Sequence, residues 1–364
     1  MSDLRACSAG DIPAVATLFQ KTFRDPRKRA PASLENALRD VIFGHPEPDA
    51  ELTSRVYVGG DGAVAGFMGV LPLSMSFRGR KVRAAVPHSL AVDDPKKHPL
   101  AGAKLVRGFL SGPQDISMSE PINGIAQSLW EKLGGVCVPS ESMEWMRVFR
   151  PFGLALSMLG NSLPVRMARP GVRLFDSIAD KVSRRAFSAG TAPRSFHRDE
   201  DVSDEVLIAH IPEFASAYAL HPVWPDATMK WMLNHASHNA ARGPLYRRMV
   251  YGAGDAPLGC YLYHGRPGGI AWMLQVLARN DAVEPVIDSM FAHAWRMGAV
   301  AIKGRTQLRF LDPLMRRNCF FFRRHSAIVH SRDPELIAAV KAGGAVTSGF
   351  AAESWLRLSG DRFE

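Results

Sequence analysis

The chain has 364 residues, of which 46% are apolar and 22% charged, and its formal net charge is +10. These values exclude a disordered chain and leave room for two domains of ordinary size. The excess positive charge favours an anionic partner, such as a phosphorylated ligand, an acidic protein, nucleic acid or an anionic membrane surface, although a basic surface kept for solubility is at least as common.

The four cysteines are far apart and form no C-x-x-C pair, so we expect free thiols and neither a zinc site nor a redox motif. The N-terminal residues 1–5 contain no apolar signal region, and no run of about 18 apolar residues is present. We therefore expect a cytoplasmic protein with no transmembrane segment and no bound metal.

The first part of the chain alternates between helical and strand patterns. Asp11 and Pro13 stand where a helix begins, and the Gly60-Asp61-Gly62 sequence is a strong hairpin turn signal. The predicted elements are a strand at 4–7, helices at 8–23 and 33–43, a hairpin over 55–77, and a strand at 82–92.

Residues 86–135 form the most informative stretch. An apolar strand ends at Val92, a charged turn with prolines follows at 93–99, and the small residues 101–103 open a helix. The first turn of a helix has free backbone N–H groups and the positive end of the macrodipole, and Lys96, Lys97 and His98 add charge beside it. This pattern predicts a phosphate-binding turn; the alternative is a plain strand–turn–helix unit with solvated lysines.

A short strand at 116–119 and a helix from Asn123 to Gly134-Gly135 follow. The helix reads Asn123, Ala126, Leu129, Trp130, Glu131, Lys132, Gly134. This resembles the N-x-x-A-x-x-L-Y-E-K-x-G sequence of the GCN5-related N-acetyltransferase (GNAT) superfamily, with Trp130 in place of the tyrosine that often serves as general acid. The family's Arg/Gln-x-x-Gly-x-Gly/Ala loop has partial counterparts in two registers, His98-x-x-Ala101-x-Ala103 and Lys97-x-x-Leu100-x-Gly102; both lack the first glycine.

The resemblance implies an α/β (α+β) fold and the use of acetyl-CoA or a longer acyl-CoA as co-substrate. It implies that backbone N–H groups near the end of the 82–92 strand hold the pantetheine arm and that the following turn holds the pyrophosphate. The implied cofactor-binding residues are Leu90, Ala91, Val92, Lys97, His98, Leu100, Ala101, Gly102, Ala103 and Asn123.

The second half repeats the order of the first. The hairpin at 56–68 has a counterpart at 250–261, preceded by predicted helices at 204–218 and 226–235. The later elements are a strand at 271–277, a helix at 283–297, a strand at 299–303, a helix at 308–317 and a strand at 319–322. The predicted architecture is a tandem GNAT fold with two mixed sheets flanked by helices.

The turn before the 283–297 helix differs from its counterpart. Asp281, Glu284 and Pro285 would repel a pyrophosphate and remove one N–H donor. We therefore predict one cofactor-binding lobe at 1–150, a linker at 151–194 and a degenerate lobe at 195–364. Within the linker, residues 170–187 are predicted to form a basic amphipathic helix. This helix would either bind an acidic carrier or lipid headgroups, or pack between the domains.

Acyl transfer from a thioester to an amine needs positioning and removal of the amine's proton. His88 on the 82–92 strand and Glu120 after the next strand are the candidate catalytic bases; the alternatives are a hydrogen-bonded strand histidine and a helix cap. His235-x-x-His238 lacks a third ligand, so we interpret it as a surface pair and not as a metal site. Basic residues are not interleaved with aromatic ones, which argues against nucleic-acid binding.

The sequence therefore predicts an N-acyltransferase that uses acyl-CoA or an acyl carrier protein. Its acceptor would be an amine on a small molecule, a saccharide or a peptide. Two alternatives remain: an aminoacyl transferase of the Fem type, which also has two GNAT lobes, and a non-catalytic binding protein with the same fold.

Overall fold

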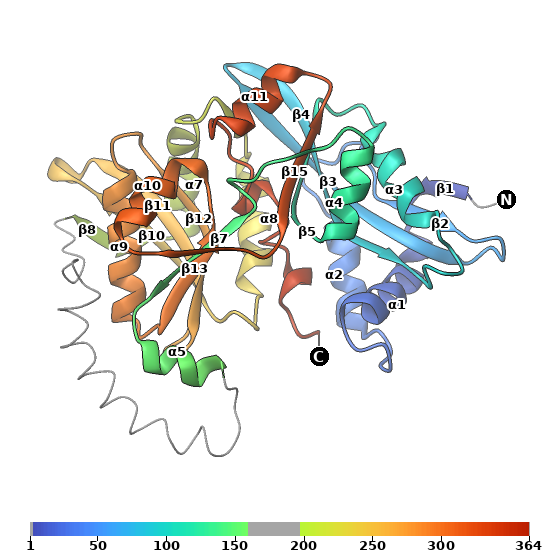
Figure 1. Cartoon of the computed structure of the whole chain (residues 1–364), viewed down its shortest axis with the longest axis horizontal. Coiled ribbons are helices and arrows are strands. Elements are labelled where there is room, and N and C mark those ends of the chain that lie inside the picture. Colours follow the sequence, from blue (N-terminus) through green and yellow to red (C-terminus); the bar gives the residue numbers. More distant parts are fainter. Residues whose placement is uncertain (1–2, 159–196, 364) are drawn as a thin grey trace. The chain divides into compact units, whose positions relative to one another are not determined.

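The computed structural model of the chain describes residues 3–158 and 197–363 (Figure 1). Contacts divide it into two compact units, each made of separate segments of the chain. The first unit contains residues 1–139, 218–238 and 325–364, and the second contains residues 140–217 and 239–324. The basic helix predicted at 170–187 lies outside the described residues.

The first unit is built on a mixed sheet. Its strands run in the order β1 (Asp3–Ala6), β2 (Arg55–Val58), β3 (Val64–Phe77), β4 (Arg80–Val92), β5 (Ile116–Ile122), β15 (Ser326–Ser331) and β6 (Val136–Cys137), with β9 (Leu220–Pro222) paired to the far end of β3. Its helices are α1 (Ile12–Phe23), α2 (Ala32–Phe43), α3 (Ala101–Leu110), α4 (Gly124–Lys132), α8 (Asp226–Ser237) and α11 (Pro334–Lys341).

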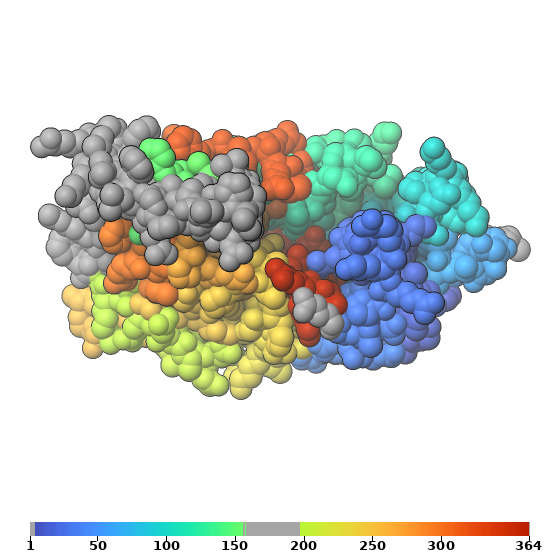
Figure 2. Space-filling view, turned by 90° about the horizontal axis from the view of Figure 1, so that it is seen from below, coloured from blue at the N-terminus to red at the C-terminus, as the bar shows by residue number. Residues whose placement is uncertain are grey.

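Burial of apolar faces holds this unit together. Leu105, Val106 and Phe109 of α3 pack with Met68 of β3 and Ala85 of β4 in one buried cluster. The C-terminal segment, which includes the short helix η5 (Arg357–Ser359), lies against the N-terminal helices (Figure 2). There the guanidinium of Arg24 donates to the carbonyl of Leu358 at 2.7 Å.

The second unit has the same strand order. Its sheet runs β8 (Arg198–Asp201), β10 (Leu245–Tyr251), β11 (Pro257–His264), β12 (Ile270–Ala278), β13 (Ala301–Arg305), β7 (Met143–Val148) and β14 (Phe320–Arg323). Its helices are α5 (Pro151–Met158), α7 (Asp204–Ala215), α9 (Val283–Arg296) and α10 (Leu311–Arg316). In each sheet the fourth and fifth strands are the parallel pair, β4 with β5 and β12 with β13. The predicted repeat of two mixed sheets flanked by helices is confirmed.

The two units exchange one strand. β7, which follows β6 in the chain, leaves the first sheet and pairs with β13 and β14, while β15 from near the C-terminus pairs with β5 and β6. Trp145 of β7 anchors the exchange because its side chain is buried against Phe291 of α9, with ring centroids 5.6 Å apart. The lobe predicted at 1–150 would include β7, but the structure places this strand in the second sheet.

Helix α8 is also placed differently from the prediction. Residues 226–235 were expected in the second lobe, but α8 belongs to the first unit. The contiguous boundaries expected at 150 and 195 thus differ from the observed units, because apolar periodicity identifies a helix or strand but not the sheet on which it packs. In the described part of the chain, no helix combines the length and apolarity needed to cross a bilayer.

Candidate functional site

The parallel strands β4 and β5 pair only over a short stretch. Their recorded register joins Ala84 to Ile116 and Ala85 to Ser117. Past these positions β4 stays paired with β3 as far as Val92, but no further pair with β5 is recorded among the described residues. The backbone of the last part of β4 therefore has one edge that β5 does not use, as a site for an extended ligand requires.

A β-bulge lies in this part of β4. The register joins Phe67 to Ala91 and Gly69 to His88, so β4 has one extra residue between these pairs. Ser89, inside the bulge, has φ 53° in the left-handed region. Bulges re-aim backbone groups and are frequent beside active sites. Nothing in the sequence indicates this feature, since serine has no preference for positive φ.

The turn between β4 and α3 is organised by Asp94. Its carboxylate accepts the backbone N–H groups of Lys96 at 3.1 Å and Lys97 at 3.4 Å, and its carbonyl accepts the N–H of His98 at 3.0 Å. The N–H of Ala101 then donates to the carbonyl of His98 at 3.1 Å. These bonds hold the chain in the conformation that begins α3.

The first turn of α3 is open. The N–H groups of Gly102 and Ala103 have no backbone acceptor within the described residues. A Cβ atom built on Gly102 would meet only Val92 Cγ2, at 3.8 Å, so packing within the protein does not require glycine here. Two free N–H donors at a helix N-terminus, with no side chain over them, suit the phosphate-binding role predicted for Gly102 and Ala103.

The charged residues of this turn are arranged differently from the expectation. His98 is buried, with its ring 6.0 Å from that of Tyr57, so its side chain packs inside the unit. The ammonium of Lys97 lies 3.1 Å from Asp61, which offsets its charge. Leu100, at the N-cap position of α3, is 63% exposed. Backbone donors, and not the predicted cluster of positive side chains, are the main feature of the turn.

Asn123 and Trp130 both have structural roles at α4. Asn123 is the N-cap residue, and its side-chain oxygen accepts the N–H of Ala126 at 2.9 Å. The residue that caps α4 is therefore Asn123. A helix cap was the alternative to catalysis considered for Glu120, and Glu120 does not have that role. Trp130 is 2% exposed and packs against Phe109, with ring centroids 5.8 Å apart.

His88 is buried in the sheet. Its ring lies over the backbone of Gly69, where an added Cβ would come within 2.1 Å of ring atoms. Its Nδ1 is 3.1 Å from the Ser89 hydroxyl, and its Nε2 has no hydrogen-bond partner within the described residues. Burial lowers the pKa of His88 to about 3, so the imidazole is neutral at pH 7.

Glu120 lies on β5, three residues beyond Ser117, the last β5 residue paired with β4. It is 3% exposed. Glu120 is therefore a buried acidic residue on the strand that separates from β4 beyond this pair. The structure therefore brings Glu120, the β4 backbone and the first turn of α3 into one unit.

The histidine pair of α8 is not a surface pair. His235 is buried, and its Nε2 lies 2.9 Å from a carboxylate oxygen of Asp40, while His238 is exposed. Burial is the main cause of the lowered pKa of His235, which the carboxylate opposes. Across residues 3–158 and 197–363, no group of three or more His, Cys, Asp or Glu side chains is arranged to hold a metal ion.

The second unit has a related framework without the open turn. Its register also shifts, between Leu262 and Tyr263 of β11, opposite β12. The first turn of α9, however, contains Glu284 and Pro285, and the carboxylate of Glu284 lies 3.2 Å from the guanidinium groups of Arg316 and Arg317. An acidic side chain and a residue without N–H replace the two free donors of α3.

Comparison with known proteins identifies the fold. The chain matches a GCN5-related N-acetyltransferase of Kribbella flavida at TM-score 0.53 and 14% identity, covering 92% of this chain and 72% of the other. A second such protein, from Anabaena variabilis, matches at TM-score 0.57 and 12% identity, covering 92% and 74%. A probable N-acyltransferase from Enterococcus faecalis matches at TM-score 0.59 and 9% identity, covering 91% and 73%.

No family model matches the chain, and no curated protein matches it in sequence. At such low identities the structural matches establish the fold alone. The chain has the fold of the GCN5-related N-acetyltransferases, present twice with one strand exchanged between the copies.

Proposed function

We propose that the chain is an N-acyltransferase that moves an acyl group from acyl-CoA to an amine, with the cofactor site in the first unit. The observation that carries this proposal is the open first turn of α3 beside the separating edge of β4. The second unit has the same framework, but Glu284 and Pro285 close the corresponding turn. The contrast between the first turns of α3 and α9 supports an anion-binding site in the first unit and not in the second.

In this proposal, backbone N–H groups of Gly102 and Ala103 bind the pyrophosphate, and the β4 backbone at Leu90 to Val92 binds the pantetheine arm. Leu100 and Ala101 shape the turn, Lys97 lies beside it in its ion pair with Asp61, and Asn123 fixes the start of α4. His98 supports the turn from inside by packing on Tyr57.

Glu120 is the proposed general base, because His88 is neutral and buried, with a pKa of about 3. It would take the proton from the attacking amine as the new amide bond forms and the thioester bond breaks. Trp130 is packed in the core and is not proposed as a proton donor. The departing thiolate would take its proton from water or leave unprotonated.

Thermal unfolding with acetyl-CoA, a long-chain acyl-CoA and free adenosine as separate ligands tests this function. Binding to the folded state at 100 times Kd stabilises by about 2.7 kcal/mol. We expect both CoA thioesters to stabilise the chain, and the larger effect to show which acyl length it prefers. Absence of stabilisation by either one would favour a Fem-type aminoacyl transferase or a non-catalytic protein with this fold.

A carrier-bound acyl donor remains a second candidate, motivated by the net charge of +10. Comparing initial rates with the same acyl group on CoA and on an acidic carrier protein at two salt concentrations separates the donors. A carrier-specific reaction should lose rate as salt rises, because exposed charge pairs are screened.

A further inference from the structure

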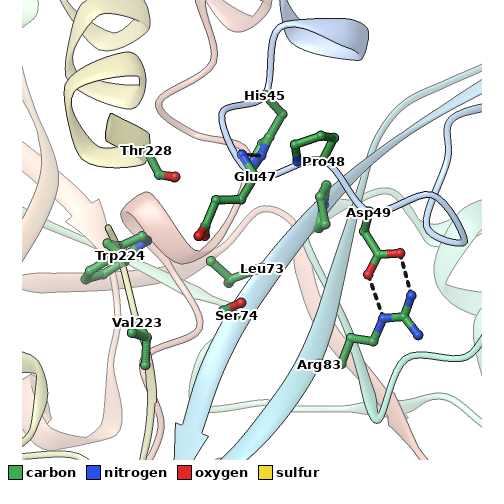
Figure 3. Close-up of a pocket in the computed structure, with 11 residues that line it drawn as sticks. His45, Glu47, Pro48, Asp49, Leu73, Ser74, Arg83, Val223, Trp224 and Thr228 are labelled. Atoms are coloured by element: carbon green, nitrogen blue, oxygen red, sulfur yellow. Dashed lines mark hydrogen bonds and ion pairs between the residues drawn. The ribbon is translucent and has the colours of Figure 1, made fainter. Parts of the chain in front are cut away.

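A cavity of about 160 Å³ lies at the edge of β3 in the first unit (Figure 3). Three segments line it together with Arg83 of β4: the loop that follows α2, residues 72–74 of β3, and the chain from Val223 into the first turn of α8. The amide of Val223 donates to the carbonyl of Ser74 at 2.8 Å, which fixes the third segment against the strand. All three belong to the same compact unit.

The cavity wall has an excess of negative charge. The guanidinium of Arg83 is held by Asp49, with Nε 2.6 Å from Oδ2, and by Glu51 at 2.9 Å. The carboxylate of Glu47 makes no hydrogen bond or ion pair with the described residues, and Figure 3 shows it extending into the space beside Trp224 and Leu73. Of the charged residues that line the cavity, Glu47 and Asp49 are negative and Arg83 is positive, which gives a formal charge of −1 in a chain whose total is +10.

The start of α8 does not reverse this charge. A helix N-terminus carries about half a positive charge, and the carboxylate of Asp226 at the first position of α8 opposes it. The cavity therefore favours a cation over an anion.

Two buried polar groups lie at the cavity wall. Trp224 is 6% exposed and Thr228 is 4% exposed, yet neither the indole Nε1 nor the threonine Oγ1 has a hydrogen-bond partner among the described residues. Buried polar groups are hydrogen-bonded in the great majority of cases. An indole N–H can only donate, so the group that pairs with it must offer an acceptor, which a ligand oxygen or a water molecule provides.

We propose that this cavity binds a small ammonium compound that also carries hydroxyl or ether oxygens. The ammonium would pair with Glu47, and an oxygen would accept the indole N–H of Trp224 and meet the hydroxyl of Thr228. Arg83 lies five residues before His88, about 17 Å along an extended strand, so the site is separate from the β4 bulge. The proposal does not depend on acyl transfer.

Three probes with six-membered rings test the contributions of the ammonium and of the hydroxyl groups separately. Glucosamine has the ammonium and the hydroxyls, glucose lacks the ammonium, and cyclohexylamine lacks the hydroxyls. Titration of the full chain, followed by calorimetry and ligand-observed NMR, should show glucosamine binding at least tenfold more tightly than either of the other two. Equal binding of glucose and glucosamine, or no binding of glucosamine, would overturn the proposal.

Variants connect the binding to the named groups. Glu47 is exposed, so Glu47→Gln keeps the fold, and it should weaken glucosamine binding at least tenfold. Glu51→Gln removes the same charge from an exposed position outside the cavity and is the matched control, expected to bind as the parent does. Equal affinities for Glu47→Gln and the parent would also refute the assignment.

Trp224→Phe removes the N–H donor and keeps an aromatic ring. It should reduce the preference for glucosamine over cyclohexylamine, with circular dichroism confirming the fold. CoA binding measured on the same samples distinguishes the two proposals: a chain that binds CoA but not glucosamine refutes only the ammonium site.

Discussion

Replacing Gly102 with glutamate tests the cofactor site most directly. A Cβ at this position meets only Val92, at an ordinary contact distance of 3.8 Å, so a side chain can begin here without displacing a neighbour. The residue sits in the first turn of α3, where a glutamate interacts favourably with the helix dipole and where replacing glycine reduces the entropy of the unfolded chain. The variant should be as stable as the parent or slightly more stable.

The loss of CoA binding follows from the two open donors. A hydrogen bond to a charged acceptor contributes about 1.5–3 kcal/mol, so losing the contacts of Gly102 and Ala103 removes about 3–6 kcal/mol. This corresponds to a weakening of roughly 10²- to 10⁴-fold. A loss of CoA affinity together with an unchanged or raised Tm would indicate that the glutamate blocks the phosphate site without disturbing the fold.

Calorimetric titration with CoA and thermal unfolding without ligand measure the two quantities. Gly10→Glu, at an exposed glycine with no contact closer than 3.8 Å, is the matched control and should bind CoA like the parent. If Gly102→Glu binds CoA within about twofold of the parent, the phosphate site lies elsewhere and the reasoning from the open turn is wrong.

Four further predictions concern the same unit. Because burial lowers the pKa of His88 to about 3, the unfolded state takes up its proton first as the pH falls below about 6.5, and stability should fall by about 1.4 kcal/mol per pH unit from this group between those two values. Urea unfolding over that range should show a flatter pH dependence in His88→Gln, and an unchanged slope would contradict the burial argument. Gly69→Ala should destabilise by about 1–3 kcal/mol, because its methyl group would overlap the His88 ring, and His88→Ala in the same chain should recover part of the loss in a double-mutant cycle; additive effects would exclude that contact. Asn123→Ala should cost about 1 kcal/mol in urea unfolding, since the cap to Ala126 is lost, whereas Asn123→Ser should restore most of it. Glu120→Gln should lower turnover about 10²- to 10⁴-fold with CoA affinity retained, and unchanged single-turnover rates would eliminate it as the base.

The sequence predicts the local elements of this fold well because hairpins and caps are determined by neighbouring residues. The hairpin turn at Gly60-Asp61-Gly62 and the start of the helix at Asn123 are of this kind. The strand exchange was not predictable in the same way, because β7 and β15 select their partners through side chains more than a hundred residues away.

The candidate site also contains features that neighbouring residues determine and features that distant residues determine. The backbone donors of α3 follow from a helix start at small residues, which the sequence contains. The inward side chain of His98, the buried ring of His88 and the positive φ of Ser89 depend on the packing of β4 against β3 and on Tyr57. Residue types alone cannot distinguish an exposed histidine from one packed on a tyrosine.

The exchanged strand also constrains how the chain folds during synthesis. β5 ends at Ile122, but its partner β15 begins only at Ser326, so one edge of β5 stays unpaired until roughly two hundred more residues have left the ribosome. Contacts at such separations slow folding and leave strand edges exposed to wrong pairing. A fragment that stops after β7 would have to fold without β15, and we expect it to aggregate rather than form an independent domain.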